Sequence, residues 1–111
     1  MTVEETLSSV VDRFNRYVAR TPAAAEELEG IRRTIQIRLT DDGTYAVDLA
    51  EGRLGNLRSG AAPAAELKIT TDSATFQGLV TKEIGPMKAI VTRRLAIEGT
   101  LDDKILLRKL L

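Results

Sequence analysis

The chain has 111 residues, of which 43% are apolar and 29% are charged; this length and composition fit one globular domain and exclude a disordered or fibrous chain. It contains no Cys and no His, which excludes disulfides, thiolate chemistry, zinc sites of the usual ligand set and His-based acid–base relays. Sixteen Lys and Arg balance sixteen Asp and Glu, so the net charge is zero and a nucleic-acid binder held by phosphate neutralisation is not expected.

Two helices are predicted at the start of the chain. Thr2 and Glu5 have the spacing of a capping box, in which both side chains satisfy free backbone N–H groups at a helix start. Apolar residues then recur at helical spacing: Val3, Leu7, Val10, Val11, Phe14 and Val18. This pattern predicts an amphipathic helix over residues 3–20. Pro22 suits the first position of a second, short helix that ends at Gly30.

The apolar period changes from 3.6 to 2 after Gly30, which predicts a series of β-strands. The inward residues of a first hairpin are Ile35, Ile37, Leu39, Tyr45, Val47 and Leu49, with a turn at 41–43. Residues 53–59 predict a third antiparallel strand, and residues 66–70 predict a fourth with Leu67 and Ile69 inward. Because each strand has one apolar face, we expect helices on one side of the sheet and solvent on the other.

The second half of the chain predicts two more helices, a fifth strand and a last helix. Thr71 or Asp72 caps a helix that ends at residue 80, and Gly85 with Pro86 starts another over 86–92. Residues 94–98 predict the fifth strand, with Leu95 and Ile97 inward. Thr100 then caps a helix that runs to the C-terminus. The class is α+β, in the order ααβββ-βαα-βα, and we predict a single domain over residues 1–111.

The last helix is apolar around more of its circumference than one core contact requires. Its apolar residues are Leu101, Ile105, Leu106, Leu107, Leu110 and Leu111. Either the other helices cover this surface completely, or it contacts a bound apolar ligand, a partner subunit or a membrane surface.

The two preceding helices form an apolar cluster with a basic border. The apolar residues are Phe76, Leu79, Val80, Ile84, Met87, Ile90 and Val91, and the basic ones are Lys82, Lys88, Arg93 and Arg94. Such an apolar cluster is usually core, although it would also line an apolar cavity. The basic residues form either a solvated face or a site for a carboxylate, a phosphate or an anionic lipid head group.

The chain has no recognisable catalytic constellation. Asp41 and Asp42 precede Gly43 in a hairpin turn, while Asp102 and Asp103 lie in a first helical turn, so both acidic pairs have structural explanations. The Ser and Thr hydroxyls have no His base. A thioester hydrolase that uses an Asp or Glu base is disfavoured, because none of these acids lies in an apolar stretch. We therefore predict a protein that is not an enzyme and uses no metal or cofactor.

Three further features of the sequence indicate the charge of a partner and the cellular location of the protein. Residues 1–52 carry six basic and ten acidic side chains, and residues 53–111 carry ten basic and six acidic ones, so the second half favours an anionic partner. The N-terminus lacks the basic and apolar regions of a secretory signal. No run approaches the ~18 apolar residues of a membrane span. We expect a soluble, cytoplasmic protein without a transmembrane segment.

The second half resembles the sterol carrier protein-2 (SCP-2) family. The resemblance is carried by AELKITTD at 65–72, then Phe76 and Leu79, GPMKA at 85–89 and RLAIEG at 94–99, and it continues into Leu106 and Lys109-Leu110. It is specific over residues 65–111 and compatible with the rest. It implies a five-stranded mixed, mainly antiparallel sheet covered on one face by helices.

The resemblance implies a non-catalytic module that binds a fatty acid, acyl-coenzyme A, phospholipid or sterol-like ligand in an apolar tunnel between the sheet and the C-terminal helices. Carried over by position, the wall is Phe76, Leu79, Val80, Met87, Ile90, Leu101, Ile105 and Leu106. The floor is Ile37, Leu67, Leu95 and Ile97, and the anionic head-group contacts are Lys88, Arg93 and Arg94. The family usually has Gly-Lys at the positions of Arg93 and Arg94.

One alternative belongs to a different class of function. The same apolar helices would then form a homodimer, or dock on a separate acyl-enzyme partner as an accessory module, and no lipid would enter. SCP-2-like domains that are fused to enzymes support this alternative.

Overall fold

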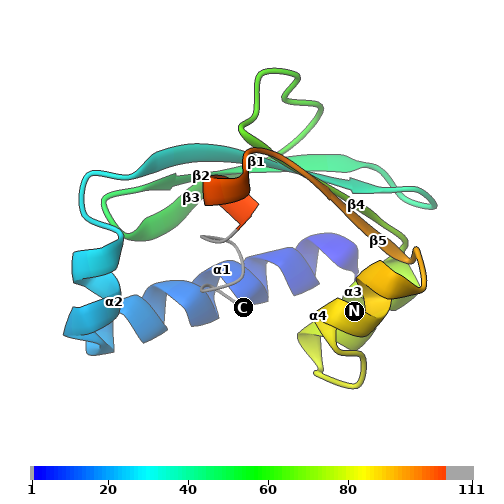
Figure 1. The fold of residues 1–111 in the computed structure, drawn as a ribbon, viewed down its shortest axis with the longest axis horizontal. Coiled ribbons are helices and arrows are strands. Elements are labelled where there is room, and N and C mark those ends of the chain that lie inside the picture. The colour runs from blue at the N-terminus through cyan, green and yellow to red at the C-terminus, as the bar shows by residue number, and fades with distance from the viewer. Residues whose placement is uncertain (1, 105–111) are drawn as a thin grey trace.

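A computed structural model describes residues 2–104 of the chain (Figure 1). In chain order the elements are α1 (Val3–Arg20), α2 (Pro22–Glu27), β1 (Arg32–Leu39), β2 (Thr44–Ala50), β3 (Arg53–Ser59), β4 (Leu67–Thr71), α3 (Ser73–Val80), α4 (Pro86–Val91) and β5 (Leu95–Glu98). Residues 101–104 are helical as well, and the remainder of the predicted last helix lies outside the described residues.

The five strands form one sheet in the order β3-β2-β1-β4-β5. The neighbouring strands β1 and β4 are parallel, and the other three pairs are antiparallel. The predicted fold class, an α+β fold with a five-stranded mixed, mainly antiparallel sheet, is therefore confirmed. The predicted starts of two strands were one residue too early, since β4 begins at Leu67 and β5 begins at Leu95.

Helices α1 to α4 lie on one face of the sheet, as predicted, and the segment that joins β3 to β4 lies over the other face (Figure 1). This segment is tied down where the backbone N–H of Ala62 donates to the side-chain oxygen of Gln36 over 2.8 Å. Ala46, the neighbour of Gln36 in register, is fully buried. The face that we expected to be solvated is therefore partly covered by protein.

Helix α1 has the predicted bounds because its cap and its apolar stripe both form. The backbone N–H of Glu5 donates to the Thr2 hydroxyl over 3.1 Å, and this closes the first turn. The buried stripe divides between two clusters. Val3 and Leu7 pack with the inward residues of β1, β2 and β4, and Val18 packs with Leu28 and Leu49.

Helices α3 and α4 start where local signals predict them. Asp72, rather than Thr71, caps α3, because its carboxylate accepts from the backbone N–H of Thr75 over 2.7 Å. The Thr71 hydroxyl instead donates to the backbone oxygen of Arg94. Gly85 and Pro86 start α4. The turn between the helices packs closely, because Ile84 lies directly against Gly78.

Candidate functional site

A row of inward-facing side chains crosses the sheet from β2 to β5. In register, Tyr45, Ile37, Ile69 and Ile97 are neighbours on successive strands. Tyr45 and Ile37 are buried in the main core cluster, whereas Ile69 and Ile97 are only half-buried. Along this row the apolar face is therefore covered at β1 and β2 and only partly covered at Ile69 of β4 and Ile97 of β5.

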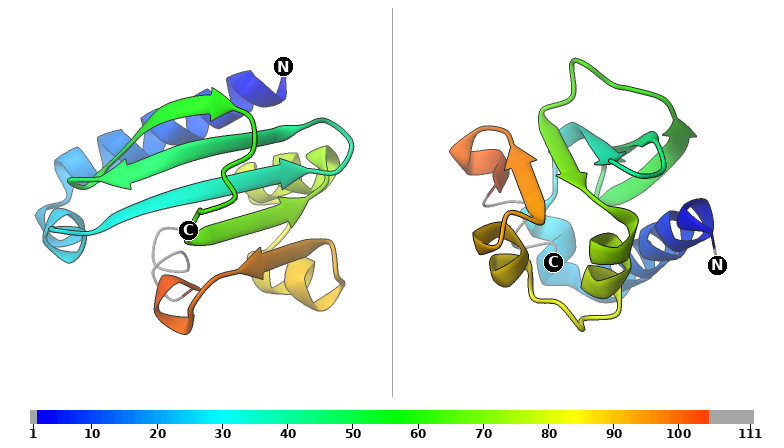
Figure 2. Two further views of the ribbon diagram at one scale, coloured as in Figure 1. Left: turned by 90° about the horizontal axis from the view of Figure 1, so that it is seen from above. Right: turned by 90° about the vertical axis from the view of Figure 1, so that its right-hand side faces the viewer.

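The positions of the helices explain why the inward side chains differ in burial. Helix α1 contacts β3 and α3, and α4 contacts β5. The right panel of Figure 2 shows α3 beside α1, and α4 beneath β5. A polar bond fixes α3 to α1, since the side-chain amide of Gln77 donates to the Thr6 hydroxyl over 3.0 Å. The region beneath β4 and β5 is thus bordered by α3 and α4, which carry most of the predicted wall.

The structure sorts the predicted site residues into three groups. Ile37, Leu67 and Leu95 are buried; Phe76, Leu79, Val80 and Ile97 are half-buried; Met87, Ile90 and Leu101 are exposed by 62%, 40% and 74%. Four of them belong to or pack against one cluster: Ile37, Leu67, Phe76 and Ile97. Ile105 and Leu106 lie outside the described residues. The ligand contacts of all these residues stay predictions.

Ile69 belongs to this region although the predicted site omitted it. The sequence placed its side chain on the inward face, but the alignment of β4 with β5 was needed to put it beside Ile97. In the structure Ile69 is half-buried and packs against the same cluster as Phe76. It therefore extends the candidate floor.

Arg94 is bound within the fold. Its Nε donates to the hydroxyl of Thr75 over 3.2 Å, and that hydroxyl donates to Asp72 over 2.8 Å. Hydrogen bonds from the backbone N–H and the hydroxyl of Thr75 lower the pKa of Asp72 below its ordinary value, and the charge of Arg94 acts in the same direction. Arg94 thus joins the start of β5 to the start of α3.

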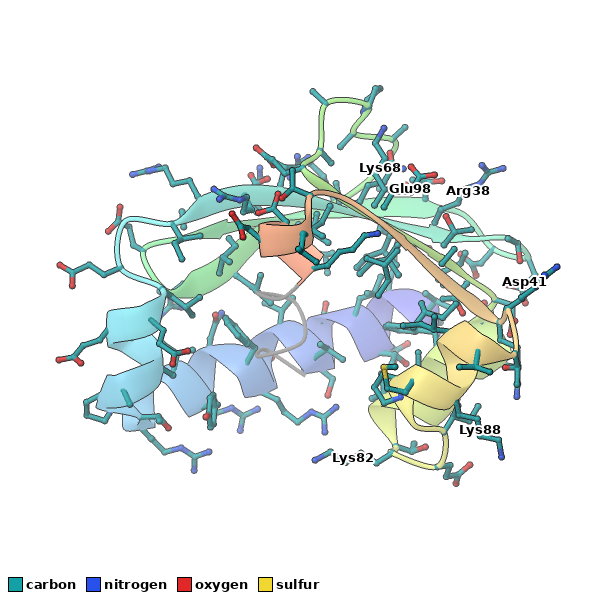
Figure 3. The ribbon with its side chains drawn as sticks, in the orientation of Figure 1. Arg38, Asp41, Lys68, Lys82, Lys88 and Glu98 are labelled. Atoms are coloured by element: carbon teal, nitrogen blue, oxygen red, sulfur yellow. The ribbon has the colours of Figure 1, made fainter. Side chains whose placement is uncertain are left out.

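Lys88, Arg93 and Arg94 are all exposed, but Arg94 differs because its guanidinium Nε donates a hydrogen bond to Thr75. Figure 3 shows Lys82 and Lys88 extending away from the fold at the α3–α4 end. Arg93 has a φ of 61°, in the left-handed region that favours glycine, and Lys82 has a φ of 64°. A glycine would adopt this conformation without strain, but in this chain a cationic side chain occupies the position.

The acidic pairs hold segments of the fold together. Asp41 accepts from the backbone N–H and the hydroxyl of Ser73, both over 2.9 Å, and these bonds lower its pKa. Asp103 accepts from Nε of Arg33 over 2.7 Å. Within residues 2–104, no group of three or more acidic side chains is arranged to hold a metal ion. The described side chains of the candidate site that pack against the main core cluster are apolar.

None of the described helices combines the length and the apolar character that a membrane crossing requires.

A separate open hollow lies on the outer face of α1, lined by Thr2, Glu4, Glu5, Ser8, Ser9 and Asp12. The lining of this hollow is polar and acidic, and none of the predicted site residues belongs to it.

Comparison with known proteins gives a family and a fold. The sequence matches the SCP-2 sterol transfer family over residues 14–110. No curated protein matches it. The structure is similar to a double mutant of the sec-alkylsulfatase PisA1, an enzyme from Pseudomonas sp., with a TM-score of 0.77 and 17% identity. That match covers 100% of this chain but only 16% of the sulfatase, so the chain spans about a sixth of its length.

Two shorter structures match over most of both chains. The crystal structure of SCP2-L2 from Aedes aegypti has a TM-score of 0.66 and 12% identity, and covers 99% of this chain and 100% of its own. The solution structure of palmitated SCP2L2 from the same organism has a TM-score of 0.69 and 17% identity, with coverage of 98% and 93%. At these identities the structural likeness shows the fold alone.

Proposed function

The chain belongs to the SCP-2 sterol transfer family, and from this premise we propose that it binds one apolar ligand beneath β4 and β5, against α3 and α4. The coarse role is lipid binding or transfer. In the finer proposal the ligand is a fatty acid, an acyl-coenzyme A or a sterol-like molecule, and the protein carries it without chemical change. Lys88 and Arg93 would contact an anionic head group, and the predicted contact of Arg94 is proposed with them.

The observation that supports the proposal is the decrease in burial along the row of inward side chains from β2 to β5. Ile69 and Ile97 continue the apolar row of Tyr45 and Ile37, but they are only half-buried. Phe76, Leu79 and Val80 are half-buried on the neighbouring helix. Apolar surface that protein leaves in partial contact with water is where an acyl chain gains the most by binding.

The apolar surface of an acyl chain provides enough free energy for micromolar binding. Burial of apolar surface contributes about 0.8 kcal/mol for each methylene, so ten methylenes contribute roughly 8 kcal/mol before the costs of ordering. After part of this is lost to immobilising the chain, micromolar affinity remains within reach. The structure of palmitated SCP2L2 makes a fatty acid the first ligand to test.

The test is titration of the delipidated protein with a fluorescent fatty-acid probe. We expect saturable, one-to-one uptake, and displacement by fatty acid, acyl-coenzyme A and sterol would rank the ligand classes. Ile97→Trp places a large ring over the candidate floor and should weaken uptake at least tenfold, about 1.4 kcal/mol. Ala96→Trp is the matched control, because Ala96 is exposed and its side chain points to the other face of β5.

Two results would contradict the proposal. A folded, delipidated protein that takes up no probe would reject lipid binding. Equal weakening by Ile97→Trp and Ala96→Trp, with both variants folded, would place the ligand elsewhere. Cell fractionation tests the predicted cytoplasmic location separately.

The second candidate is the interaction module, either a homodimer or an accessory domain for an acyl-enzyme partner. The specific observation in its favour is that two large apolar side chains, Val91 and Leu101, are exposed by 76% and 74%. A delipidated protein that remains dimeric by size-exclusion chromatography with light scattering, and takes up no probe, would favour it over the carrier.

A further inference from the structure

Strand β5 is an edge strand whose outer side is unpaired within the described residues. The sheet ends at β3 on one side and at β5 on the other. On β3, Asn15 bonds the backbone groups of Leu54, and the pairing with β2 shifts register between Ala46 and Asp48. On β5, no loop or side chain among residues 2–104 bonds the backbone of Leu95–Glu98, which pairs with β4 alone. The left panel of Figure 2 shows β5 at the margin of the sheet, with no strand beyond it.

An edge of this kind is open to pairing with another strand. Alternate residues of an edge strand direct their backbone N–H and C=O groups away from the sheet. Proteins commonly block such pairing with a proline, a bulge or a covering segment. Strand β5 contains no proline and pairs with β4 without a register shift. Its length of four residues limits what backbone bonds alone contribute, so a partner must add contacts beyond the strand.

The charges beside β5 suit a second copy of the same strand. In an antiparallel pair related by a two-fold axis, the start of one strand lies beside the end of the other. Arg93 and Arg94 precede β5, whereas Glu98 ends it and Asp102 follows it, and all four are exposed. The ion pairs found within residues 2–104 include none of these four side chains. Two-fold pairing therefore brings the cations of each copy next to the acids of the other.

The exposed apolar residues have the same symmetry. An axis at Ala96 places Ala96 opposite itself and Leu95 opposite Ile97 of the second copy. Val91 and Leu101 are the most exposed large apolar residues of the described chain, at 76% and 74%, and each lies five positions from Ala96. The segment with Val91 in one copy then approaches the segment with Leu101 in the other. Both ends of the strand pair gain apolar contact in this way.

We propose that two copies of this chain pair through β5, antiparallel and with Ala96 at the two-fold axis, so that their sheets become continuous. Backbone hydrogen bonds between the edge strands hold the copies together, and the opposite charges fix the register. The contact is small, so association is weak, concentration-dependent and reduced by salt. This inference does not rest on the proposed function. It also differs from the interaction module above, because each copy keeps its candidate site for a ligand.

The first test is disulfide cross-linking of the delipidated full-length chain, which has no cysteine of its own. Ala96→Cys places two thiols opposite each other at the axis, where antiparallel neighbours have Cα atoms about 4.5–5.5 Å apart, within the range of a disulfide. Glu98→Cys is the matched control, because residue 98 is exposed on the same face of β5 but would lie roughly 13 Å from its copy. We expect Ale96→Cys to form covalent dimer at least tenfold faster than Glu98→Cys under mild oxidation.

The second test is sedimentation equilibrium of charge variants. Arg93→Glu alone, and Glu98→Lys alone, each bring like charges together and should weaken dimerisation at least fivefold. A one-to-one mixture of the two variants should restore most of the association, because the heterodimer again places opposite charges side by side. Such recovery would also show that the single variants are folded.

Three results would overturn the proposal. They are a protein that stays monomeric at every concentration, equal cross-linking of Ala96→Cys and Glu98→Cys, and a dimer that Val91→Ser dissociates but the charge variants leave unchanged. A monomer that takes up the fatty-acid probe would reject the pairing and leave the proposed function standing. A dimer cross-linked through Ala96→Cys that takes up no probe would confirm the pairing and reject lipid binding.

Discussion

The side-chain amide of Asn15 in α1 bonds both backbone groups of Leu54 in the edge strand β3. Its Nδ2 donates to the Leu54 oxygen over 2.9 Å, and its Oδ1 accepts from the Leu54 N–H over 2.8 Å. An edge strand has free backbone groups on one side, and this amide takes the place of a further strand there. The pair fixes α1 over the β3 side of the sheet, which leaves the β4–β5 side to α3 and α4.

Asn15→Ala should lower the free energy of unfolding by about 1–3 kcal/mol, because two hydrogen bonds are lost and two partly buried backbone groups lose their partner. Urea unfolding measures this. Arg13→Ala, at an exposed position of the same helix, should change it by less than about 0.5 kcal/mol. An Asn15→Ala protein as stable as the parent would show that α1 is held without this pair.

Asp103→Asn should destabilise the fold, since Asp103 is only 5% exposed and its carboxylate is paired with Arg33. The Arg33 side chain is 34% exposed, so solvent screens the pair, and we expect a loss of about 1–3 kcal/mol. Thermal unfolding measures the change. Asp102→Asn, at the exposed neighbour, is the control, and equal effects of the two substitutions would argue against the ion pair.

Gly78→Ala should destabilise the protein although alanine is the better helix former. A Cβ at residue 78 would lie 2.8 Å from Cγ1 of Ile84 and closer still to its Cδ1. Such overpacking costs about 1–3 kcal/mol and exceeds the roughly 1 kcal/mol gained in helix propensity. Ile84→Val in the Gly78→Ala background removes Cδ1 and should recover part of the loss. A double-mutant cycle with no coupling would contradict this packing.

Stability should fall as the pH drops below about 4. Hydrogen bonds from Thr75 lower the pKa of Asp72, and hydrogen bonds from Asn56 and Thr34, together with Arg58, lower that of Asp48. The unfolded chain, with Asp pKa values near 3.9, then binds more protons than the folded one. The stabilisation is complete above the unfolded pKa and is lost as the pH falls through the folded pKa.

Asp72→Asn tests this pH dependence because asparagine also caps helices well. At neutral pH the variant should lose less than about 1 kcal/mol, but its stability should fall less steeply between pH 4 and pH 2 in urea unfolding. Asp12→Asn on the outer face of α1 is the control for removal of a carboxylate. An unchanged slope in Asp72→Asn would show that Asp72 does not contribute to acid unfolding.

Much of the fold follows from local patterns in the sequence. The bounds of α1 match the predicted residues 3–20 because its cap and its apolar stripe depend on residues a few positions apart. The alternating residues of β1 and β2 likewise predicted which side chains face the helices. The family resemblance over residues 65–111 added the mixed sheet, and the match over residues 14–110 agrees with it.

The candidate site depends on contacts that no local pattern contains. The parallel pairing of β1 with β4 and the alignment of β5 beside it decide that Ile97 lies next to Ile69, and the position of α1 decides that both are left half-buried. The buried partner of Arg33 is 70 residues away. The sequence did not distinguish Arg94 from the neighbouring cations, but in the structure its Nε donates a hydrogen bond to Thr75.

The amino-acid sequence therefore determined the elements, their order and their apolar faces, because capping and periodicity act over a few residues. Only the tertiary structure decided which apolar side chains are fully buried and which cations make hydrogen bonds or ion pairs within the fold. The physical reason is that burial and ion pairing depend on how distant segments pack, and this packing is a property of the whole folded chain.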